Sequence, residues 1–256
     1  MRLTGFQDRL AIVTGAAGGI GRAVVAALAE AGARVIATDT PQALAADPVP
    51  GVPNRALDVR DGAAAEALVA EAESEFGPLA LGVHTAGVLA IGPLLDLDPQ
   101  DWDRVMGVNA NGAFHVTRAF GRAMARQGRG AIVSVSSNAA GIPRLNMGAY
   151  AASKAAQTML IRCLGLELAA QGVRCNIVAP GSTLTPMQTG MWTEDGGAGQ
   201  RAVIEGSLKA FRTGIPLGKL ATPQDIANAV MFLLSDQAGH VTMADLYVDG
   251  GATLRG

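Results

Sequence analysis

The sequence has few of the residues that build disulfide frameworks and metal sites. Its 256 residues include two cysteines and three histidines. Cys163 and Cys175 are too few for a disulfide framework or a cysteine-rich zinc site, and His84, His115 and His240 lack the spacing of metal ligands. We therefore expect no bound metal, and we expect both cysteines to be buried and reduced.

An excess of charge of one sign and long hydrophobic runs are also missing. Lysine and arginine number 20, aspartate and glutamate 22, and the net charge is −2, which argues against binding to nucleic acid or to a membrane surface. No apolar run reaches the roughly 18 residues of a membrane span, and the N-terminal segment lacks the apolar core of a signal peptide. With 49% hydrophobic and 16% charged residues, a globular, cytoplasmic protein is expected.

Short apolar runs alternate with segments of helical periodicity. This alternation is typical of a Rossmann-type, doubly wound α/β fold, in which a parallel sheet carries helices on both faces. No linker or repeat divides the chain, so residues 1–256 are expected to form a single domain, with the cofactor half in roughly residues 1–130. The expected strands are Leu10–Thr14, Ala33–Asp39, Leu79–His84, Ala131–Ser136, Val173–Ala179 and Asp245–Gly250.

Two helices can be located from their ends. Apolar residues at helical spacing begin at Ile20, and Gly32 stands where a helix would stop. A second helix is expected to start after Thr222, with Pro223 in its first turn and Asp225 at its third position, a combination typical of a capping box. The first helix lies between two expected strands, as in a dinucleotide-binding unit.

The segment from Thr183 to Gln200 is rich in glycine and has no clear helical pattern. It follows a strand end, where open α/β sheets bind ligands. We expect a lid over a substrate in roughly residues 183–212, with an idle insertion as the alternative.

A glycine-rich turn, TGAAGGIG, directly follows the first expected strand. Gly15, Gly19 and Gly21 would allow a tight turn and a close approach of the backbone to a pyrophosphate at the helix N-terminus. Asp39 ends the second strand, where a carboxylate accepts hydrogen bonds from a ribose diol and repels a 2′-phosphate. The pattern predicts NAD as the cofactor, although nearby Arg22 argues for NADP. Asp58, after the expected third strand, is either an adenine-binding residue or a solvated turn residue.

Tyr150 and Lys154 lie one helical turn apart in AYAASKAAQTML. A free tyrosine titrates near 10 and needs a shift of about 3 pKa units to act as a base near neutrality, which a desolvated ammonium beside it could supply. Ser137, at a strand end, could hold a substrate oxygen against the tyrosine. Asn109 lies in a helical segment, where a buried amide must be satisfied by backbone or water.

These residues together resemble the short-chain dehydrogenase/reductase family. The glycine-rich turn, VNANG, VSSNAAG, the Tyr-x-x-x-Lys pair and PGS at 180–182 occur in the family's order over nearly the whole chain. The resemblance implies a seven-stranded sheet, a homotetramer and a catalytic tetrad of Asn109, Ser137, Tyr150 and Lys154. In this tetrad the tyrosine is the acid/base, the lysine lowers its pKa and holds the nicotinamide ribose, the serine orients the reacting oxygen, and the asparagine maintains a water relay. The further nucleotide contacts implied are Ile20, Val59, Ala86, Gly87, Tyr150, Lys154, Pro180 and Gly181.

The chain departs from the family at one visible point. The usual Asn-Asn-Ala-Gly after the fourth strand is replaced here by His84, Thr85, Ala86 and Gly87. Because threonine can both donate and accept a hydrogen bond, we expect cofactor binding to persist.

Segments beyond the cofactor half are similar to a narrower group of the family, whose members oxidise a small aryl-acid dihydrodiol in catechol siderophore synthesis. The similarity covers IPRLNMGAYAASKAA, GVRCNIVAPGSTLTPMQTGMW, GIPLGKLATPQDIANAVMFLLSD and HVTMADLYVDGGATL. Such a substrate carries a carboxylate, and Arg144 is the candidate to bind it, with a solvated loop arginine as the alternative. Met147, Met187, Gln188 and Trp192 either line the ring pocket or serve as plain packing.

Three functions stay open at this point. The first is NAD-dependent oxidation of the dihydrodiol. The second is another short-chain alcohol dehydrogenase or a 3-oxoacyl-type ketoreductase, although Asp39 argues against the NADPH that such ketoreductases usually take. The third is a non-catalytic NAD-binding protein, against which the presence of all four tetrad residues argues.

A basic stripe of Arg118, Arg122 and Arg126, spaced four residues apart, is a further feature of the sequence. We expect it to be solvated or to face another subunit rather than to bind an acidic carrier protein.

Overall fold

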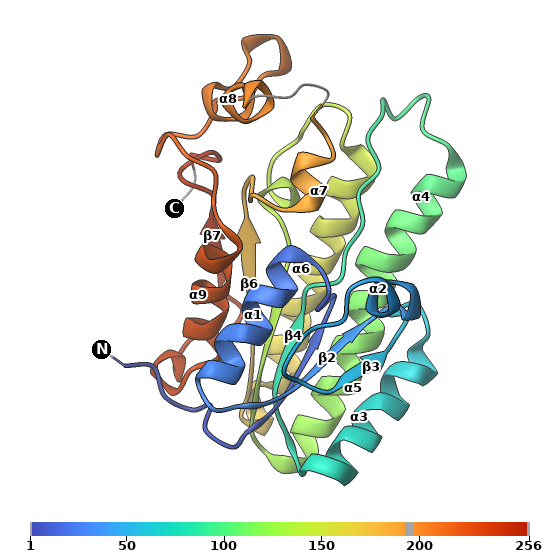
Figure 1. Cartoon of the computed structure of the whole chain (residues 1–256), viewed down its shortest axis with the longest axis vertical. Coiled ribbons are helices and arrows are strands. Elements are labelled where there is room, and N and C mark those ends of the chain that lie inside the picture. Colours follow the sequence, from blue (N-terminus) through green and yellow to red (C-terminus); the bar gives the residue numbers. More distant parts are fainter. Residues whose placement is uncertain (1, 193–196, 255–256) are drawn as a thin grey trace.

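The computed structural model describes residues 2–192 and 197–254. Its centre is a seven-stranded parallel sheet in the order β3-β2-β1-β4-β5-β6-β7, with helices on both sides (Figure 1). The expected doubly wound α/β fold is therefore confirmed. The strands are β1 (Leu10–Thr14), β2 (Arg34–Asp39), β3 (Asn54–Ala56), β4 (Leu79–His84), β5 (Gly130–Val135), β6 (Val173–Pro180) and β7 (Asp245–Val248).

Helices fill most of the connections between the strands. No helix in residues 2–192 and 197–254 has the length and apolarity needed to cross a bilayer. The α-helices are α1 (Gly19–Glu30), α2 (Pro41–Ala46), α3 (Gly62–Phe76), α4 (Pro99–Met106), α5 (Gly112–Gln127), α6 (Gly148–Leu168), α7 (Pro186–Thr189), α8 (Ala198–Glu205) and α9 (Pro223–Leu234). A π-helical turn occupies Gly107–Asn111, and 3₁₀ turns occupy Asn138–Ala140, Ala169–Gln171, Leu208–Ala210 and Asp236–Ala238.

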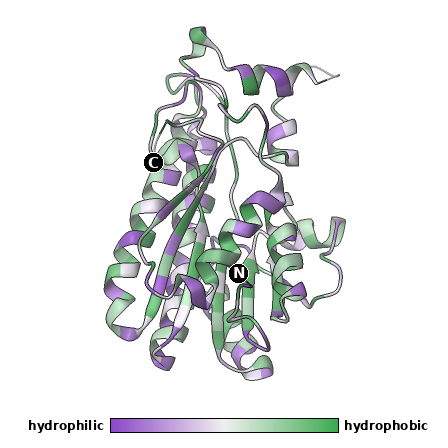
Figure 2. Cartoon of the chain, turned by 90° about the vertical axis from the view of Figure 1, so that its left-hand side faces the viewer, coloured by the Kyte–Doolittle hydropathy of each residue, from purple (hydrophilic) through white to green (hydrophobic). Residues whose placement is uncertain are grey.

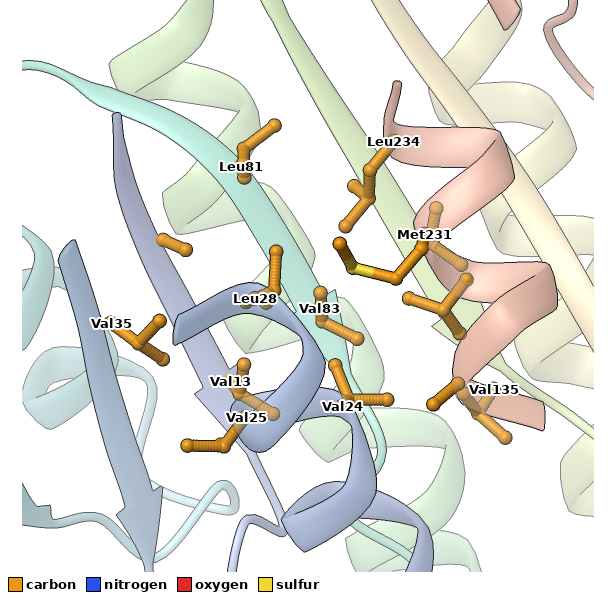
Figure 3. Packing of buried hydrophobic residues seen from close by; sticks show 14 of the residues in the cluster. Val13, Val24, Val25, Leu28, Val35, Leu81, Val83, Val135, Met231 and Leu234 are labelled. Carbon is orange, nitrogen blue, oxygen red and sulfur yellow. The ribbon is translucent and has the colours of Figure 1, made fainter. Parts of the chain in front are cut away.

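Both faces of the sheet are buried, and β1 shows why. Successive side chains of a strand point to opposite faces. Val13 belongs to a cluster with Leu28 of α1 and Met231 of α9 (Figure 3), whereas Leu10 and Ile12 belong to a second cluster with residues of α3, α5 and α6. A strand covered on both sides reads as a continuous apolar run, as the sequence of β1 does.

The predicted helix ends agree with the structure. α1 ends at Glu30, two residues before Gly32. At α9 the Thr222 hydroxyl accepts a hydrogen bond from the backbone N–H of Asp225, and the Asp225 carboxylate accepts one from the N–H of Thr222. The capping box is therefore confirmed.

The prediction that both cysteines are buried is wrong for Cys163. Cys175 is buried in β6, but Cys163 is exposed on α6. The buried face of α6 includes Ile161 and Gly165, so the position midway between them points away from the sheet.

The glycine-rich segment, which has no clear helical pattern in its sequence, contains α7 and the start of α8. Thr185 and Pro186 start α7, because the threonine hydroxyl caps the backbone N–H of Gln188 and proline suits the first helical position. α8 projects beyond the end of the sheet (Figures 1 and 2). Residues 193–196 of the predicted lid lie outside the described residues, and the lid stays a prediction.

The basic stripe on α5 pairs with acidic side chains of α3. Arg122 lies 2.8 Å and Arg118 4.0 Å from a carboxylate oxygen of Glu66, and Arg126 lies 2.7 Å from Glu73. The three arginines keep 40–64% of their side-chain surface exposed in the single chain, which agrees with a stripe that is solvated or faces another subunit.

Candidate active site

Two cavities meet beyond the carboxyl ends of the central strands. The glycine-turn cavity, of about 400 Å³, is bordered by Gly15, Gly19 and Asp39, and the tyrosine cavity, of about 290 Å³, is bordered by Ser137 and Tyr150. Residues common to both cavities are Ile20, Thr85, Gly87, Thr185 and Met187. A ligand could therefore extend from one cavity into the other.

Most of the predicted nucleotide contacts border the glycine-turn cavity. They are Gly15, Gly19, Ile20, Gly21, Asp39, Asp58, Val59, Ala86 and Gly87. The remaining ones, Tyr150, Lys154, Pro180 and Gly181, border the tyrosine cavity.

The glycine turn is shaped by close backbone contacts. Gly15 has φ +66°, and a Cβ there would lie 2.5 Å from the backbone nitrogen of Ala86. A Cβ on Gly21 would lie 2.1 Å from the carbonyl oxygen of Gly15. No side chain caps α1, because its N-cap residue is Gly18, and the first N–H groups of a helix lack intrahelical partners. The turn therefore fits a pyrophosphate at the start of α1.

Asp39 is fixed at the end of β2. Its Oδ2 accepts a hydrogen bond from the N–H of Ala17 at 3.0 Å, and its Oδ1 accepts one from the N–H of Thr40 at 2.8 Å. Arg22, the cation that argued for NADP, lies 2.8 Å from the carboxylate of Asp47 and does not line the cavity. A carboxylate, rather than a free cation, thus stands at this end of the cavity.

Asp58 is paired with Arg60 rather than free. The Arg60 guanidinium donates to both carboxylate oxygens at 2.5–3.1 Å, and this hydrogen bonding holds the pKa of Asp58 below its usual value. The remaining cation on the cavity wall, Arg104, lies 2.7 Å from Asp101. An adenine contact of Asp58 stays a prediction.

Ser137, Tyr150 and Lys154 border the tyrosine cavity together. Ser137 follows β5, and its Oγ accepts a hydrogen bond from the N–H of Ala139 at 3.1 Å. Tyr150 and Lys154 come from the first turns of α6, and the Lys154 Nζ lies 5.8 Å from the centroid of the Tyr150 ring. The predicted Tyr-x-x-x-Lys pair therefore shares one helix face.

The electrostatics of this pair differ from the sequence expectation. Burial raises the pKa of Tyr150, and its hydrogen bond with Ser137 opposes that rise. Burial also lowers the pKa of Lys154 to about 7. Lys154 is 3% exposed and has no carboxylate partner among the described residues, so its charged form is itself disfavoured. The expected lowering of the Tyr150 pKa by Lys154 is therefore not found.

Gln157 is a site residue that the sequence reasoning missed. Its Oε1 accepts a hydrogen bond from the Lys154 Nζ at 2.8 Å, and its Nε2 donates to Ser134 Oγ at 2.7 Å. The Nζ also donates to the carbonyl oxygen of Val135 at 3.1 Å. The available signal was the three-residue spacing, which puts Gln157 next to Lys154 on the same helix face.

His84 and Thr85, where the chain departs from the family, both contact Thr14 at the end of β1. The Nδ1 of His84 lies 2.9 Å from Thr14 Oγ1, and the hydroxyl of Thr85 donates to the Thr14 carbonyl oxygen at 2.6 Å. Burial, and then the charge of Lys154, lower the pKa of His84 to about 3. The imidazole is therefore neutral, and its contact with Thr14 connects the ends of β4 and β1.

Asn109 lies in the π-helical turn between α4 and α5, so the expected helical segment is π rather than α there. Its Nδ2 donates to the Val88 carbonyl oxygen and to Ser153 Oγ, both at 2.9 Å, and its Oδ1 accepts from the Val88 N–H at 2.8 Å. The side chain is fully buried and borders neither cavity. It ties the segment after β4 to α6, and the water relay stays a prediction.

The substrate candidates all border the tyrosine cavity. They are Arg144, Met147, Met187, Gln188 and Trp192. The cavity also includes Arg212, a second site residue that the sequence reasoning missed. The sequence feature that could have pointed to Arg212 is a single charge within the mostly apolar run FRTGIPL.

Arg144 makes no ion pair with any described residue. Burial lowers its pKa, the nearby charge of Arg212 lowers it further, and Asp249 raises it. Cations on the glycine-turn side are thus paired, whereas the tyrosine cavity has unpaired guanidinium groups.

Comparisons with known proteins agree with this geometry. A family described as "Enoyl-(Acyl carrier protein) reductase" matches residues 15–253. The chain is 49% identical to the 2,3-dihydro-2,3-dihydroxybenzoate dehydrogenase of Bacillus subtilis, covering 99% of both chains. It is 44% identical to the Escherichia coli protein of that name, over 97% of this chain and 98% of the relative. It is 43% identical to the vibriobactin-specific one of Vibrio cholerae, over 95% of each.

Two solved structures of dehydrogenases also resemble this chain over nearly its whole length. An aldohexose dehydrogenase of Thermoplasma acidophilum superimposes with a TM-score of 0.87 at 28% identity, covering 100% of this chain and 98% of that one. A short-chain type dehydrogenase/reductase of Mycobacterium ulcerans also has a TM-score of 0.87, at 33% identity over 98% and 92% of the two chains. Members of this group use NAD or NADP as the hydride carrier. The chain belongs to the short-chain dehydrogenase/reductase family.

Proposed function

We propose that this protein oxidises 2,3-dihydro-2,3-dihydroxybenzoate to 2,3-dihydroxybenzoate with NAD, in the synthesis of catechol siderophores. The observation that supports this most directly is the content of the tyrosine cavity. An alcohol-oxidising pair, Ser137 and Tyr150, shares that cavity with the unpaired Arg144. A secondary alcohol on a small ring that also carries a carboxylate matches this combination, and full-length relatives bear the name of this reaction.

The roles that we propose for the side chains follow from their positions. Tyr150 accepts the proton of one ring hydroxyl, and Ser137 holds that hydroxyl oxygen. Bound NAD supplies the acceptor for the hydride. Lys154, held by Gln157 and the Val135 carbonyl oxygen, keeps a positive charge near the tyrosine when it is protonated. Asn109 holds the segment after β4 against α6.

The pKa of Tyr150 sets a condition on this chemistry. Since burial raises that pKa, the phenol of the protein alone is a poor base at neutral pH. We propose that the missing stabilisation of the phenolate comes from the positive nicotinamide ring of the oxidised cofactor together with Ser137. Proton transfer to Tyr150 would then require bound NAD.

The preference for NAD over NADP is a separate proposal. Asp39 stands at the glycine-turn cavity with its carboxylate, and the nearby guanidinium groups of Arg22, Arg60 and Arg104 are each paired with an acid. A 2′-phosphate would therefore meet a negative charge without a free cation to balance it.

We further propose that the protein is a cytoplasmic homotetramer, as the family resemblance implies. A mass measurement in solution would test the number of subunits.

A single assay tests the reaction. The purified chain is given NAD and 2,3-dihydro-2,3-dihydroxybenzoate, and NADH and 2,3-dihydroxybenzoate are quantified. Equal amounts of the two products are expected. No product from this acid, together with turnover of a 3-hydroxyacyl thioester, would contradict the proposal and favour a ketoreductase.

A further inference from the structure

We propose that Arg212 joins Arg144 in binding the substrate carboxylate, so that a second arginine, supplied by the segment after α8, determines which alcohols the enzyme accepts. This inference rests on the proposed function and names the group that selects its substrate.

The backbone around Arg212 turns the charged side chain inward. Arg212 and Ser207 exchange two backbone hydrogen bonds of 2.9 and 3.0 Å, which close a short loop. Within it, Leu208 and Phe211 are 96% and 87% exposed, whereas Arg212 is half-buried and borders the tyrosine cavity. Ordinarily the apolar residues of a surface loop pack and its charge faces water. In this loop the charge of Arg212 instead borders the cavity, where it could bind an anion.

The Arg212 guanidinium has hydrogen-bond donors that lack good acceptors. Its Nε is buried and has no hydrogen-bond partner among the described residues. Its Nη2 lies 3.8 Å from the sulfur of Met147, and a thioether is a weak acceptor. Arg212, like Arg144, makes no ion pair within residues 2–192 and 197–254. A buried guanidinium donor without an acceptor is costly, and a carboxylate in the cavity would supply the acceptor that the Arg212 Nε lacks.

Asp249 is a buried carboxylate whose charge acts on Arg144. Its Oδ2 accepts hydrogen bonds from Asn138 Nδ2 at 3.3 Å and from the N–H of Thr253 at 3.0 Å, and its Oδ1 accepts one from the N–H of Gly251 at 2.9 Å. This carboxylate is therefore fixed, and its negative charge acts on Arg144. The cations that border the cavity, Arg144, Arg212 and Lys154, outnumber it, so the cavity favours an anion.

The arrangement predicts discrimination by charge. A ring alcohol with a free carboxylate satisfies both arginines, whereas a neutral polyol or an ester leaves them unpaired in the cavity. Discrimination of this kind is strong, because the penalty falls on buried donors that find no acceptor.

The test compares Arg212→Gln with a matched control, Arg201→Gln, on α8 in the same segment. Arg201 is exposed and borders neither cavity. Each variant is assayed with NAD on the dihydrodiol acid and on its methyl ester. Arg212→Gln should lower kcat/KM for the acid by about 10- to 100-fold, the effect of losing one or two charge-assisted hydrogen bonds. The ester should change by less than about threefold, Arg201→Gln should leave both substrates unchanged, and Arg212→Lys should be intermediate.

Equal losses on acid and ester would overturn the inference, because Arg212 would then have a structural role only. Unchanged kinetics on the acid would overturn it as well. If the wild-type protein oxidises no dihydrodiol, the proposed function fails, and binding of 2,3-dihydroxybenzoate measured by calorimetry decides the inference separately. Binding weakened tenfold or more by Arg212→Gln supports the paired arginines, and unweakened binding refutes them.

Discussion

Lys154 should make the nucleotide-free protein more stable at alkaline pH than at acidic pH. The side chain is 3% exposed and lacks a carboxylate partner in the described part of the chain, and burial lowers its pKa from 10.5 to about 7. Between about pH 7 and pH 10.5 the unfolded chain therefore binds more protons at this lysine than the folded protein does, so the free energy of unfolding rises with pH across that window.

The size of the effect follows from the shift. One pKa unit corresponds to about 1.4 kcal/mol, and between pH 6 and pH 9 Lys154 should contribute a rise of about 3 kcal/mol in the free energy of unfolding. Lys154→Met removes the titrating group and with it this rise. Methionine also leaves Gln157 Oε1 without its donor, which costs about 1–3 kcal/mol, but this cost is the same at both pH values.

Urea denaturation followed by circular dichroism at pH 6 and pH 9 measures the difference. Wild type should gain about 3 kcal/mol more than Lys154→Met over this interval, and Lys219→Met, at an exposed lysine, should behave as wild type. Parallel pH curves for wild type and Lys154→Met would show instead that Lys154 is as well solvated in the folded as in the unfolded state.

Three further predictions concern activity. Tyr150→Phe should lower turnover by about 10³-fold or more, because the hydroxyl transfers the proton. NADH binding, followed by fluorescence, should change less than about twofold, because the other predicted nucleotide contacts stay in place. Substantial residual turnover would exclude Tyr150 as the base. Asp39→Ser should shift the ratio of kcat/KM values for NAD and NADP toward NADP by about tenfold or more, because a carboxylate facing the 2′-phosphate is removed, and an unchanged ratio would count against that role. Gln157→Leu should lower kcat, because the Lys154 ammonium loses a hydrogen-bond acceptor. For the same reason, this variant should lose activity at a lower alkaline pH than the wild type, whereas Gln157→Glu should lose activity at a higher pH. Identical pH profiles for the three proteins would show that Gln157 does not position the lysine.

The sequence predicted the framework well because local patterns determine it. Continuous apolar runs gave the buried strands such as Leu10–Thr14, and the Thr222–Asp225 capping box gave the start of α9, since capping depends on neighbouring residues only. The glycine turn was recognisable because close backbone approaches leave room for nothing larger at Gly15 and Gly21.

The missed features depend on contacts between distant parts of the chain. Arg144 and Arg212 become neighbours only when the segment after α8 lies over the carboxyl ends of the strands. The raised pKa of Tyr150 results from burial, which a Tyr-x-x-x-Lys spacing does not reveal. Cys163 was assigned to the interior from the usual preference of cysteine, but which face of α6 carries it depends on how that helix packs.

The proposed reaction requires one alcohol carbon to lie between the Tyr150 hydroxyl and the hydride-accepting carbon of NAD. A crystal structure with NADH and 2,3-dihydroxybenzoate would show whether the ring binds in this way. A ring oxygen should lie within hydrogen-bond distance of both Tyr150 and Ser137, with the carboxylate against Arg144. A ring bound with its carboxylate toward solvent and its hydroxyls away from Tyr150 would contradict it.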